Sequence, residues 1–206
     1  MDKKLAKLLT DWKLPLLRDW DLQMLFQERP EKWHDAVRTA TSKGYLIHLR
    51  RGVYLIGSPY RRDRCHPFEA AQTIYGPSYI SFESALSYHG WIPEAVYCVV
   101  SATTERSKTF KTPLATFEYL HTPRKNFFAN VMKEGDILIA EPWKAIADMI
   151  YDRRKTWSKL ADLSDDMRIE LETMLESDRE SLFQIATCYP SARVRAIMSR
   201  FYEELV

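Results

Sequence analysis

The stretch WHDAVRTATSKGYLIHLRRGVYLIG, residues 33–57, predicts a helix followed by a basic β-hairpin. The helix has one apolar stripe at helical spacing, made of Trp33, Ala36, Val37 and Ala40. Gly44 follows it at the position where helices commonly end. Two β-prone runs then flank a turn at Arg51 and Gly52. We therefore expect the helix and the hairpin to pack as one unit.

Two more helices are predicted ahead of this stretch. Residues 2–13 carry leucines at helical spacing until Pro15 interrupts them, and a second helix is expected to begin after Asp19 or Asp21. The helix with the apolar stripe is expected to run from Pro30 to Lys43. Three helices followed by a basic hairpin is the order of a winged helix-turn-helix. This motif is therefore predicted over residues 19–57.

The rest of the chain mixes helical and strand-like segments. Helices are predicted over residues 67–75, 81–89, 142–151 and, with a break at Pro190, from 164 onward. Strands are predicted over residues 95–102, 114–121 and 135–140. The predicted fold class is α+β, with a winged helix-turn-helix over 1–58, an α/β domain with a small mixed sheet over 59–155, and a helical C-terminal extension over 156–206.

Charge is distributed unevenly along the chain, although the net charge is only +2. Residues 29–64 hold nine Lys and Arg against three Asp and Glu, whereas residues 160–180 hold eight acids against two arginines. This asymmetry indicates a basic working surface and a separately solvated acidic segment.

The face of the third helix opposite its apolar stripe carries side chains that can reach bases and phosphates in a major groove. The predicted DNA-binding residues are Lys32, His34, Arg38, Thr39, Ser42 and Lys43, together with Arg50 and Arg51 at the hairpin tip. Arg38 is nominated for a base contact, because its guanidinium matches the two acceptors of guanine. Glu31 and Asp35 would repel DNA; both fall in the first helical turn, where a capping role is expected. A winged helix with a purely structural role is the alternative.

Neither a membrane span nor a catalytic or metal site is predicted. No apolar run is long enough to cross a bilayer, no secretory signal is seen, and three scattered cysteines favour a reducing cytoplasm. Cys65 and His66 lack the spacing of a zinc site, and are interpreted as a buried free thiol beside a helix-capping histidine. Ser81 is likewise expected to cap the helix that follows it. We predict no cofactor and no enzymatic activity.

Three short motifs in the same order resemble the AbiEi antitoxin family of abortive-infection, type IV toxin–antitoxin operons. The wing motif is Arg51-Gly52-Val53-Tyr54. The central motif runs from Tyr79 through Ser81 and Ser84-Ala85-Leu86 to His89-Gly90, and the helical motif is Trp143-Lys-Ala-Ile-Ala-Asp148. Asp148 is expected to pair with an arginine of its own domain, either Arg106 or Arg124.

The resemblance implies a cytoplasmic DNA-binding autorepressor of its own promoter, with a second domain needed to neutralise a toxin. In that family the toxin resembles a nucleotidyltransferase, and neutralisation does not require a stable complex. Two alternatives stay open. The second domain could be a ligand or protein sensor that controls DNA affinity, or the chain could be an enzyme acting on nucleic acid.

Overall fold

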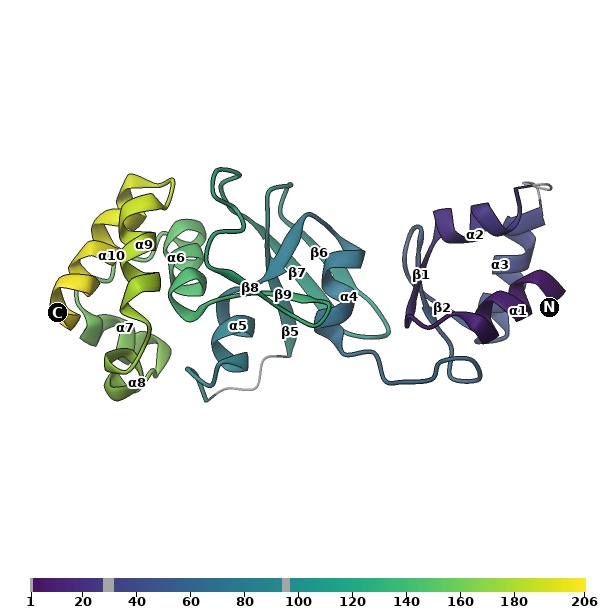
Figure 1. Cartoon of the computed structure of the whole chain (residues 1–206), viewed down its shortest axis with the longest axis horizontal. Coiled ribbons are helices and arrows are strands. Elements are labelled where there is room, and N and C mark those ends of the chain that lie inside the picture. The colour runs from purple at the N-terminus through teal and green to yellow at the C-terminus, as the bar shows by residue number, and fades with distance from the viewer. Residues whose placement is uncertain (1, 28–31, 94–96) are drawn as a thin grey trace.

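The protein is a mixed α+β fold with a three-stranded and a six-stranded sheet, and the computed structural model describes residues 2–27, 32–93 and 97–206. Figure 1 shows the N-terminal helices and the small sheet at one end, the larger sheet in the middle, and the C-terminal helices at the other end. The two termini therefore lie at opposite ends of the molecule. No helix within the described residues is long and apolar enough to cross a membrane.

The N-terminal unit alternates helices with the strands of the small sheet. Its elements are α1 (Lys3–Asp11), β1 (Leu16–Arg18), α2 (Asp19–Leu25), α3 (Trp33–Ser42), β2 (Leu46–Arg50) and β3 (Val53–Ile56). The sheet is antiparallel in the order β1-β3-β2. The predicted helices and hairpin are confirmed, whereas β1 was not predicted, because a strand of three residues is too short to show a period in the sequence.

The apolar stripe of α3 packs into the core of this unit. Val37 and Ala40 are buried beside Leu5, Leu22 and Leu46, and Trp33 and Ala36 are half-buried against the same cluster. Burying one such side chain stabilises the fold by about 1.5–3 kcal/mol. Helix α3 ends at Ser42 with Lys43 as its cap residue, one position before the predicted cap, and Gly44 follows in the left-handed conformation with a φ of +71°. The predicted start at Pro30 lies outside the described residues.

Gly57 closes the small sheet through a close backbone approach. Its N–H donates to the carbonyl of Tyr45 at 2.8 Å. A Cβ atom at this position would lie 1.8 Å from the carbonyl oxygen of Gly44. Only a glycine fits there, which explains why the hairpin is followed by Gly57 rather than by another β-branched residue.

The second part of the chain contains the larger sheet and the remaining helices. The strands are β4 (Ser78–Ile80), β5 (Cys98–Thr103), β6 (Lys108–Lys111), β7 (Thr116–His121), β8 (Val131–Glu134) and β9 (Ile137–Ala140). The helices are α4 (Pro67–Ile74), α5 (Phe82–Tyr88), α6 (Pro142–Arg153), α7 (Leu160–Met167), α8 (Leu171–Leu175), α9 (Arg179–Cys188) and α10 (Ala192–Leu205).

The larger sheet is mixed, in agreement with the prediction. Its order is β6-β7-β5-β4-β9-β8; the pairs β4–β9 and β5–β7 are parallel, and the other neighbours are antiparallel. Strands β4, β6 and β8 were not predicted. Two of them, β6 and β8, lie at the edges of the sheet, where exposed lysines replace the alternating apolar residues that make a strand recognisable.

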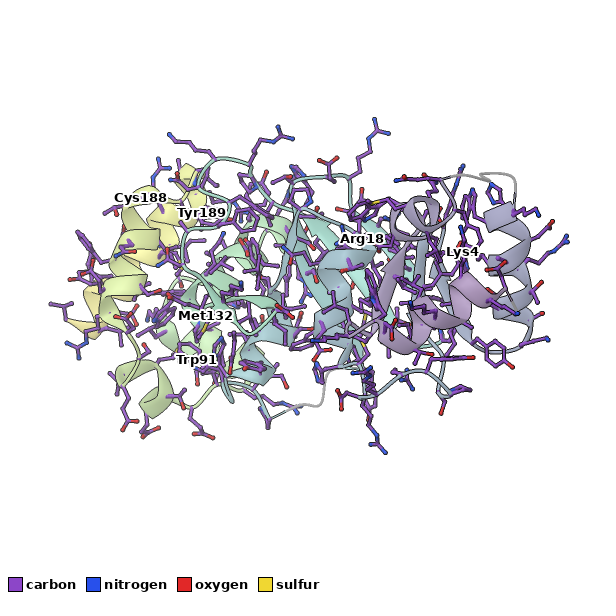
Figure 2. The ribbon with its side chains drawn as sticks, turned by 45° about the vertical axis from the view of Figure 1, so that its right-hand side comes forward. Lys4, Arg18, Trp91, Met132, Cys188 and Tyr189 are labelled. Atoms are coloured by element: carbon purple, nitrogen blue, oxygen red, sulfur yellow. The ribbon has the colours of Figure 1, made fainter. Side chains whose placement is uncertain are left out.

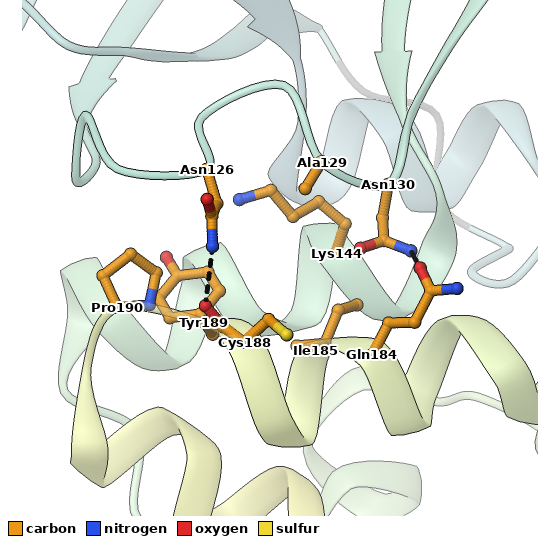
Figure 3. A pocket seen from close by; sticks show the side chains of 9 residues that line it. All are labelled: Asn126, Ala129, Asn130, Lys144, Gln184, Ile185, Cys188, Tyr189 and Pro190. Carbon is orange, nitrogen blue, oxygen red and sulfur yellow. Dashed lines mark hydrogen bonds between the residues drawn. The ribbon is translucent and has the colours of Figure 1, made fainter.

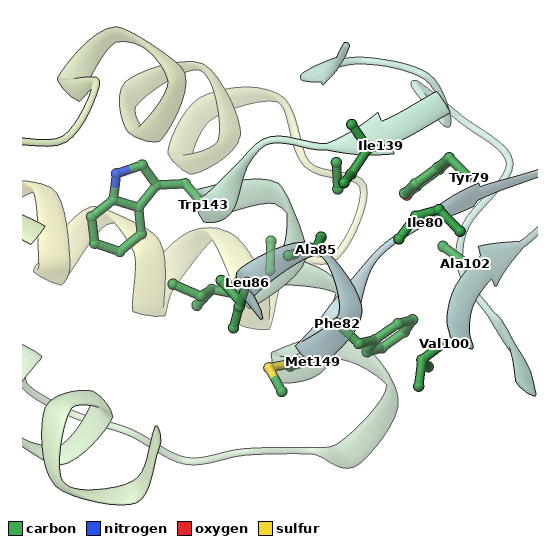
Figure 4. Packing of buried hydrophobic residues seen from close by; sticks show 14 of the residues in the cluster. Tyr79, Ile80, Phe82, Ala85, Leu86, Val100, Ala102, Ile139, Trp143 and Met149 are labelled. Carbon is green, nitrogen blue, oxygen red and sulfur yellow. The ribbon is translucent and has the colours of Figure 1, made fainter. Parts of the chain in front are cut away.

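One continuous hydrophobic core joins the larger sheet to the C-terminal helices. Figure 4 shows side chains of α5, α6, β4, β5 and β9 meeting in this core. Leu163, Met174 and Phe201 of α7, α8 and α10 belong to the same cluster as Val100 of β5. The acidic segment 160–180 therefore spans α7, α8 and the start of α9, helices that bury their apolar side chains in the same core as the sheet.

The small sheet also contacts this core. Leu49, Val53 and Leu55 of β2 and β3 belong to the larger cluster, whereas Leu46 and Tyr54 of the same strands belong to the N-terminal cluster. Because successive side chains of a strand point to opposite faces, the hairpin is covered on both faces. The N-terminal unit is thus packed against the second part of the chain and not merely tethered to it.

Candidate functional site

The predicted DNA-binding face of α3 is exposed to solvent. His34, Arg38 and Ser42 are exposed, and Thr39 is half-buried beside them. Lys32 and Lys43, which flank the helix, are exposed as well. The hydroxyl of Ser42 donates to the Thr39 carbonyl at 2.9 Å, which leaves its oxygen able to accept a hydrogen bond. The structure therefore brings these six predicted residues onto or beside one helical surface.

Arg38, the nominated base-contacting residue, is paired with Asp35 one turn earlier. Its Nη2 donates to Asp35 Oδ1 at 2.9 Å, and the two side chains are 81% and 73% exposed. An exposed pair of this kind contributes only about 0–1 kcal/mol, so a stronger acceptor can displace Asp35. Asp35 was expected to cap the helix; its carboxylate instead holds the guanidinium. Glu31 lies outside the described residues.

The two arginines of the hairpin diverge. Arg51 is exposed at the turn, where Gly52 adopts a φ of +77°. Arg50, by contrast, is half-buried, and its guanidinium carbon lies 5.8 Å from the ring centre of Phe110 on β6. The Nε atom of Arg50 is buried and has no hydrogen-bond partner among the described residues. The β2–β3 register shifts between His48 and Arg50, and this irregularity turns Arg50 toward the larger sheet. Both arginines were expected at the hairpin tip, but only Arg51 is exposed there, whereas Arg50 lies against the larger sheet.

A groove lies between the first turns of α2 and α3 and the tip of the hairpin. It is lined by Asp19, Gln23, Trp33, His34, His48, Arg51, Gly52 and Tyr54. The backbone N–H of Asp19 donates to the Gly52 carbonyl at 3.0 Å, which joins α2 to the turn. Burial first, and then the charge of Asp19, raise the pKa of Tyr54 to about 12. The sequence shows His48 as one of several basic residues, but no signal in it places His48 beside His34.

A fully buried polar cluster lies in the second part of the chain, centred on Asp148. Its Oδ2 accepts from the hydroxyls of Tyr79 and Ser81, both at 2.8 Å. Its Oδ1 accepts from Lys144 Nζ at 2.9 Å and from the Tyr189 hydroxyl at 3.0 Å. Burial, followed by the Asp148 charge, raises the pKa of both tyrosines well above the usual value. The carboxylate therefore has four donors in an interior site.

This cluster corrects two expectations. Asp148 pairs with Lys144 of its own helix rather than with Arg106 or Arg124, and Arg124 instead lies 3.9 Å from Glu105. Ser81 precedes α5 but makes no side-chain capping bond, because its hydroxyl is used by Asp148. The prediction for the Cys65–His66 pair is confirmed: Cys65 is buried and free, and His66 Nδ1 accepts from the Phe68 N–H at the start of α4.

A small pocket opens beside Lys144. Figure 3 shows Asn126 of the loop before β8 facing Cys188 and Tyr189 at the end of α9, and Asn130 of the same loop facing Gln184. Asn126 Nδ2 donates to the Cys188 carbonyl at 3.1 Å, and Asn130 Nδ2 donates to Gln184 at 3.2 Å. These amides tie the loop to α9. Among the described residues, no three His, Cys, Asp or Glu side chains converge on a metal position, here or elsewhere.

Helix α3 and the buried cluster are on different parts of the molecule. Figure 2 places Arg18, at the start of α2, on the N-terminal side and Tyr189 on the C-terminal side of the larger sheet. Two of the three motifs that resemble the AbiEi family supply Tyr79, Ser81, Lys144 and Asp148, and thus meet in the cluster. The wing motif lies in the hairpin.

Comparison with models of known protein families found no match, and neither did a search of curated proteins. The resemblance to the AbiEi family therefore depends on the three motifs and on their order along the chain. The class of protein that the fold defines is a mixed α+β protein with a three-helix, three-stranded N-terminal unit.

Proposed function

We propose that the N-terminal unit is a winged helix that binds duplex DNA through α3 and the turn of the β2–β3 hairpin. The observation that carries this proposal is the exposed surface of α3, which presents Arg38 and His34, together with the groove that His34 shares with Arg51 of the turn. The order of the elements, with a small antiparallel sheet closing on three helices, supports it. Arg50 is left out of the proposed interface, because its guanidinium faces Phe110.

The proposed biological role is that of an autorepressor and antitoxin of a type IV toxin–antitoxin operon, acting in the cytoplasm. Its DNA partner is its own promoter, and its functional partner is a nucleotidyltransferase-like toxin. The support is the resemblance of the three motifs, two of which supply one buried cluster. Asp148 is fully buried and both of its carboxylate oxygens accept two hydrogen bonds, and this favours a structural role for the carboxylate over a catalytic one.

Fluorescence anisotropy with a labelled duplex from the region upstream of the gene tests DNA binding. The double variant Arg38→Ala/Arg51→Ala removes one proposed base contact and one proposed phosphate contact. We expect the base contact alone to be worth about 1–3 kcal/mol, and the log–log salt dependence of binding to become shallower by about 0.9 for each phosphate that the variant no longer neutralises. Arg200→Ala on the exposed surface of α10 is the matched control. Equal affinities of the double variant and the control would contradict the assignment.

The antitoxin role is tested separately from DNA binding. Co-expression with a nucleotidyltransferase encoded next to the gene should restore growth that the toxin alone arrests. The double variant should lose promoter repression but keep this protection, because both substitutions lie outside the second part of the chain. Growth arrest that persists with the unchanged protein would rule out neutralisation of that toxin.

A sensor-type regulator is the second candidate, and one observation favours it. The hairpin of the proposed winged helix packs on the larger sheet through Leu49, Val53 and Leu55, and Arg50 lies over Phe110. A ligand that rearranged β6 would therefore act directly on the DNA-binding hairpin. DNA affinity that changes with a small molecule, in a chain without an adjacent toxin gene, would favour this candidate.

A further inference from the structure

The groove between α2, α3 and the hairpin is lined by side chains whose total charge can change with pH. Its volume is about 490 Å³, and it is lined by three side chains that can carry positive charge: His34 of α3, His48 of β2 and Arg51 of the turn. All three are exposed, so the groove opens to solvent. Their charges come from three different elements that the fold brings to one place.

The opposing charges around this groove are few. Asp19 of α2 supplies the one carboxylate in the lining. Tyr54 of β3 is neutral near pH 7, as tyrosines ordinarily are, and burial followed by the Asp19 charge raises its pKa further, to about 12. On the adjoining surface of α3, Asp35 is paired with Arg38. With neutral imidazoles the charges of Arg51 and Asp19 cancel, whereas two imidazolium groups make the groove doubly positive.

The two imidazoles are held by aromatic neighbours rather than by acidic ones. The ring of His34 lies 3.7 Å, centre to centre, from that of Trp33. The ring of His48 lies 5.5 Å from that of Tyr54. Asp19 Oδ1 is buried and has no hydrogen-bond partner among the described residues. A buried acceptor of this kind costs free energy as long as no donor reaches it.

We propose that this groove binds a backbone phosphate of duplex DNA and that His34 and His48 take up protons when the phosphate enters. The inference rests on the proposed DNA-binding function and adds to it a regulation by pH. Histidine is the side chain that ordinarily changes charge between pH 5 and 8. A phosphodiester stays anionic in this range, so the protonated groove binds it more tightly than the neutral one. Gln23, also in the lining, adds an uncharged amide donor.

The expected effect follows from proton linkage. Each proton taken up on binding strengthens binding about tenfold per pH unit as the pH falls through the range in which the imidazole titrates. Two histidines therefore set an upper limit of about a hundredfold per pH unit. Because counterion release also contributes, the ionic strength must be held constant across the series.

The test measures the dissociation constant of the full chain for its upstream duplex by fluorescence anisotropy from pH 6 to pH 8. The variants are His34→Gln, His48→Gln and the double variant, with His121→Gln, an exposed histidine of β7, as the control. Circular dichroism melts confirm that each variant folds. A second arm titrates inorganic phosphate by calorimetry at pH 6, and this distinguishes a phosphodiester site from a site for free phosphate.

The expected result is tighter binding at pH 6 in the unchanged protein and in His121→Gln, and a flat pH profile in the double variant. Binding that does not change with pH, or a pH dependence that survives in the double variant, overturns the inference and leaves DNA binding intact. No DNA binding at any pH contradicts the proposed function itself. Tight binding of inorganic phosphate without binding of DNA contradicts the assignment to a DNA backbone.

Discussion

Replacing Asp148 by Asn tests whether the buried cluster holds the second part of the chain together. Asp148 is fully buried and accepts four hydrogen bonds, and Lys144 is 4% exposed. The substitution keeps the size of the side chain but leaves the Lys144 ammonium without its counter-charge. Removing one partner of a buried ion pair costs about 3–5 kcal/mol.

A limit on this cost follows from the chemistry of lysine. An ammonium group without its counter-charge can release its proton and become neutral. For a lysine with the ordinary pKa of about 10.4, deprotonation at pH 7 costs a free energy of about 4.6 kcal/mol. The expected loss is therefore about 3–4.6 kcal/mol. For a chain of this size it corresponds to a fall in the melting temperature of roughly 6–18 °C.

The assay is urea unfolding of the wild-type protein and Asp148→Asn at pH 7 and pH 9. Lys144→Met and the double variant Lys144→Met/Asp148→Asn complete a double-mutant cycle. The double variant should be more stable than Asp148→Asn, because no unpaired charge remains. The Asp148→Asn deficit should shrink at pH 9, since neutralising the lysine costs about 1.4 kcal/mol less for each pH unit. A deficit below about 1 kcal/mol at pH 7, or additive effects in the cycle, would refute the reasoning.

Two further predictions concern stability. Gly57→Ala should destabilise the protein by more than about 2 kcal/mol in urea unfolding, because the added Cβ lies 1.8 Å from the Gly44 carbonyl. Gly135→Ala, where the φ is +59° but no atom lies within 4 Å, should cost only about 1 kcal/mol, and equal losses would contradict the close approach. Hydrogen bonds from Ser158, chiefly that of its backbone N–H, lower the pKa of Asp162. The ionised carboxylate therefore stabilises the fold above about pH 3.9, the ordinary pKa of an aspartate. This stabilisation is lost as the pH falls through the lowered pKa of the folded state. The melting temperature of Asp162→Asn should therefore be lower than that of the wild type at pH 6, and the difference should shrink in acid. A difference that does not change with pH would count against this assignment, as would the same pH dependence in the control variant Asp165→Asn.

The sequence was sufficient for the N-terminal helices and the hairpin because each carries a local signal. The apolar stripe of α3, the glycine after it and the Arg51–Gly52 turn all lie within 25 residues of chain. Strands β1 and β4 have three residues each, and their pairing is decided by partners far along the sequence. A pattern of period two cannot show in three residues.

The candidate sites divide in the same way. The exposure of Arg38 can be predicted from helical periodicity. The position of Arg50 over Phe110 results from a shift in the β2–β3 register, and no residue in the sequence indicates that shift. Lys144 and Asp148 are four residues apart on one helix, so their pairing was open to prediction. The contribution of Tyr189, 41 residues further on, depends on how α9 packs, and the sequence carries no signal for it.

The buried cluster and the hairpin of the N-terminal unit are connected through packing as well as along the chain. Asp148 joins β4, α6 and the end of α9, and these elements share one core with Leu49, Val53 and Leu55 of the hairpin. A core of close-packed side chains transmits a change of position, because its neighbours cannot yield independently. The C-terminal helices are therefore part of the body that positions the hairpin.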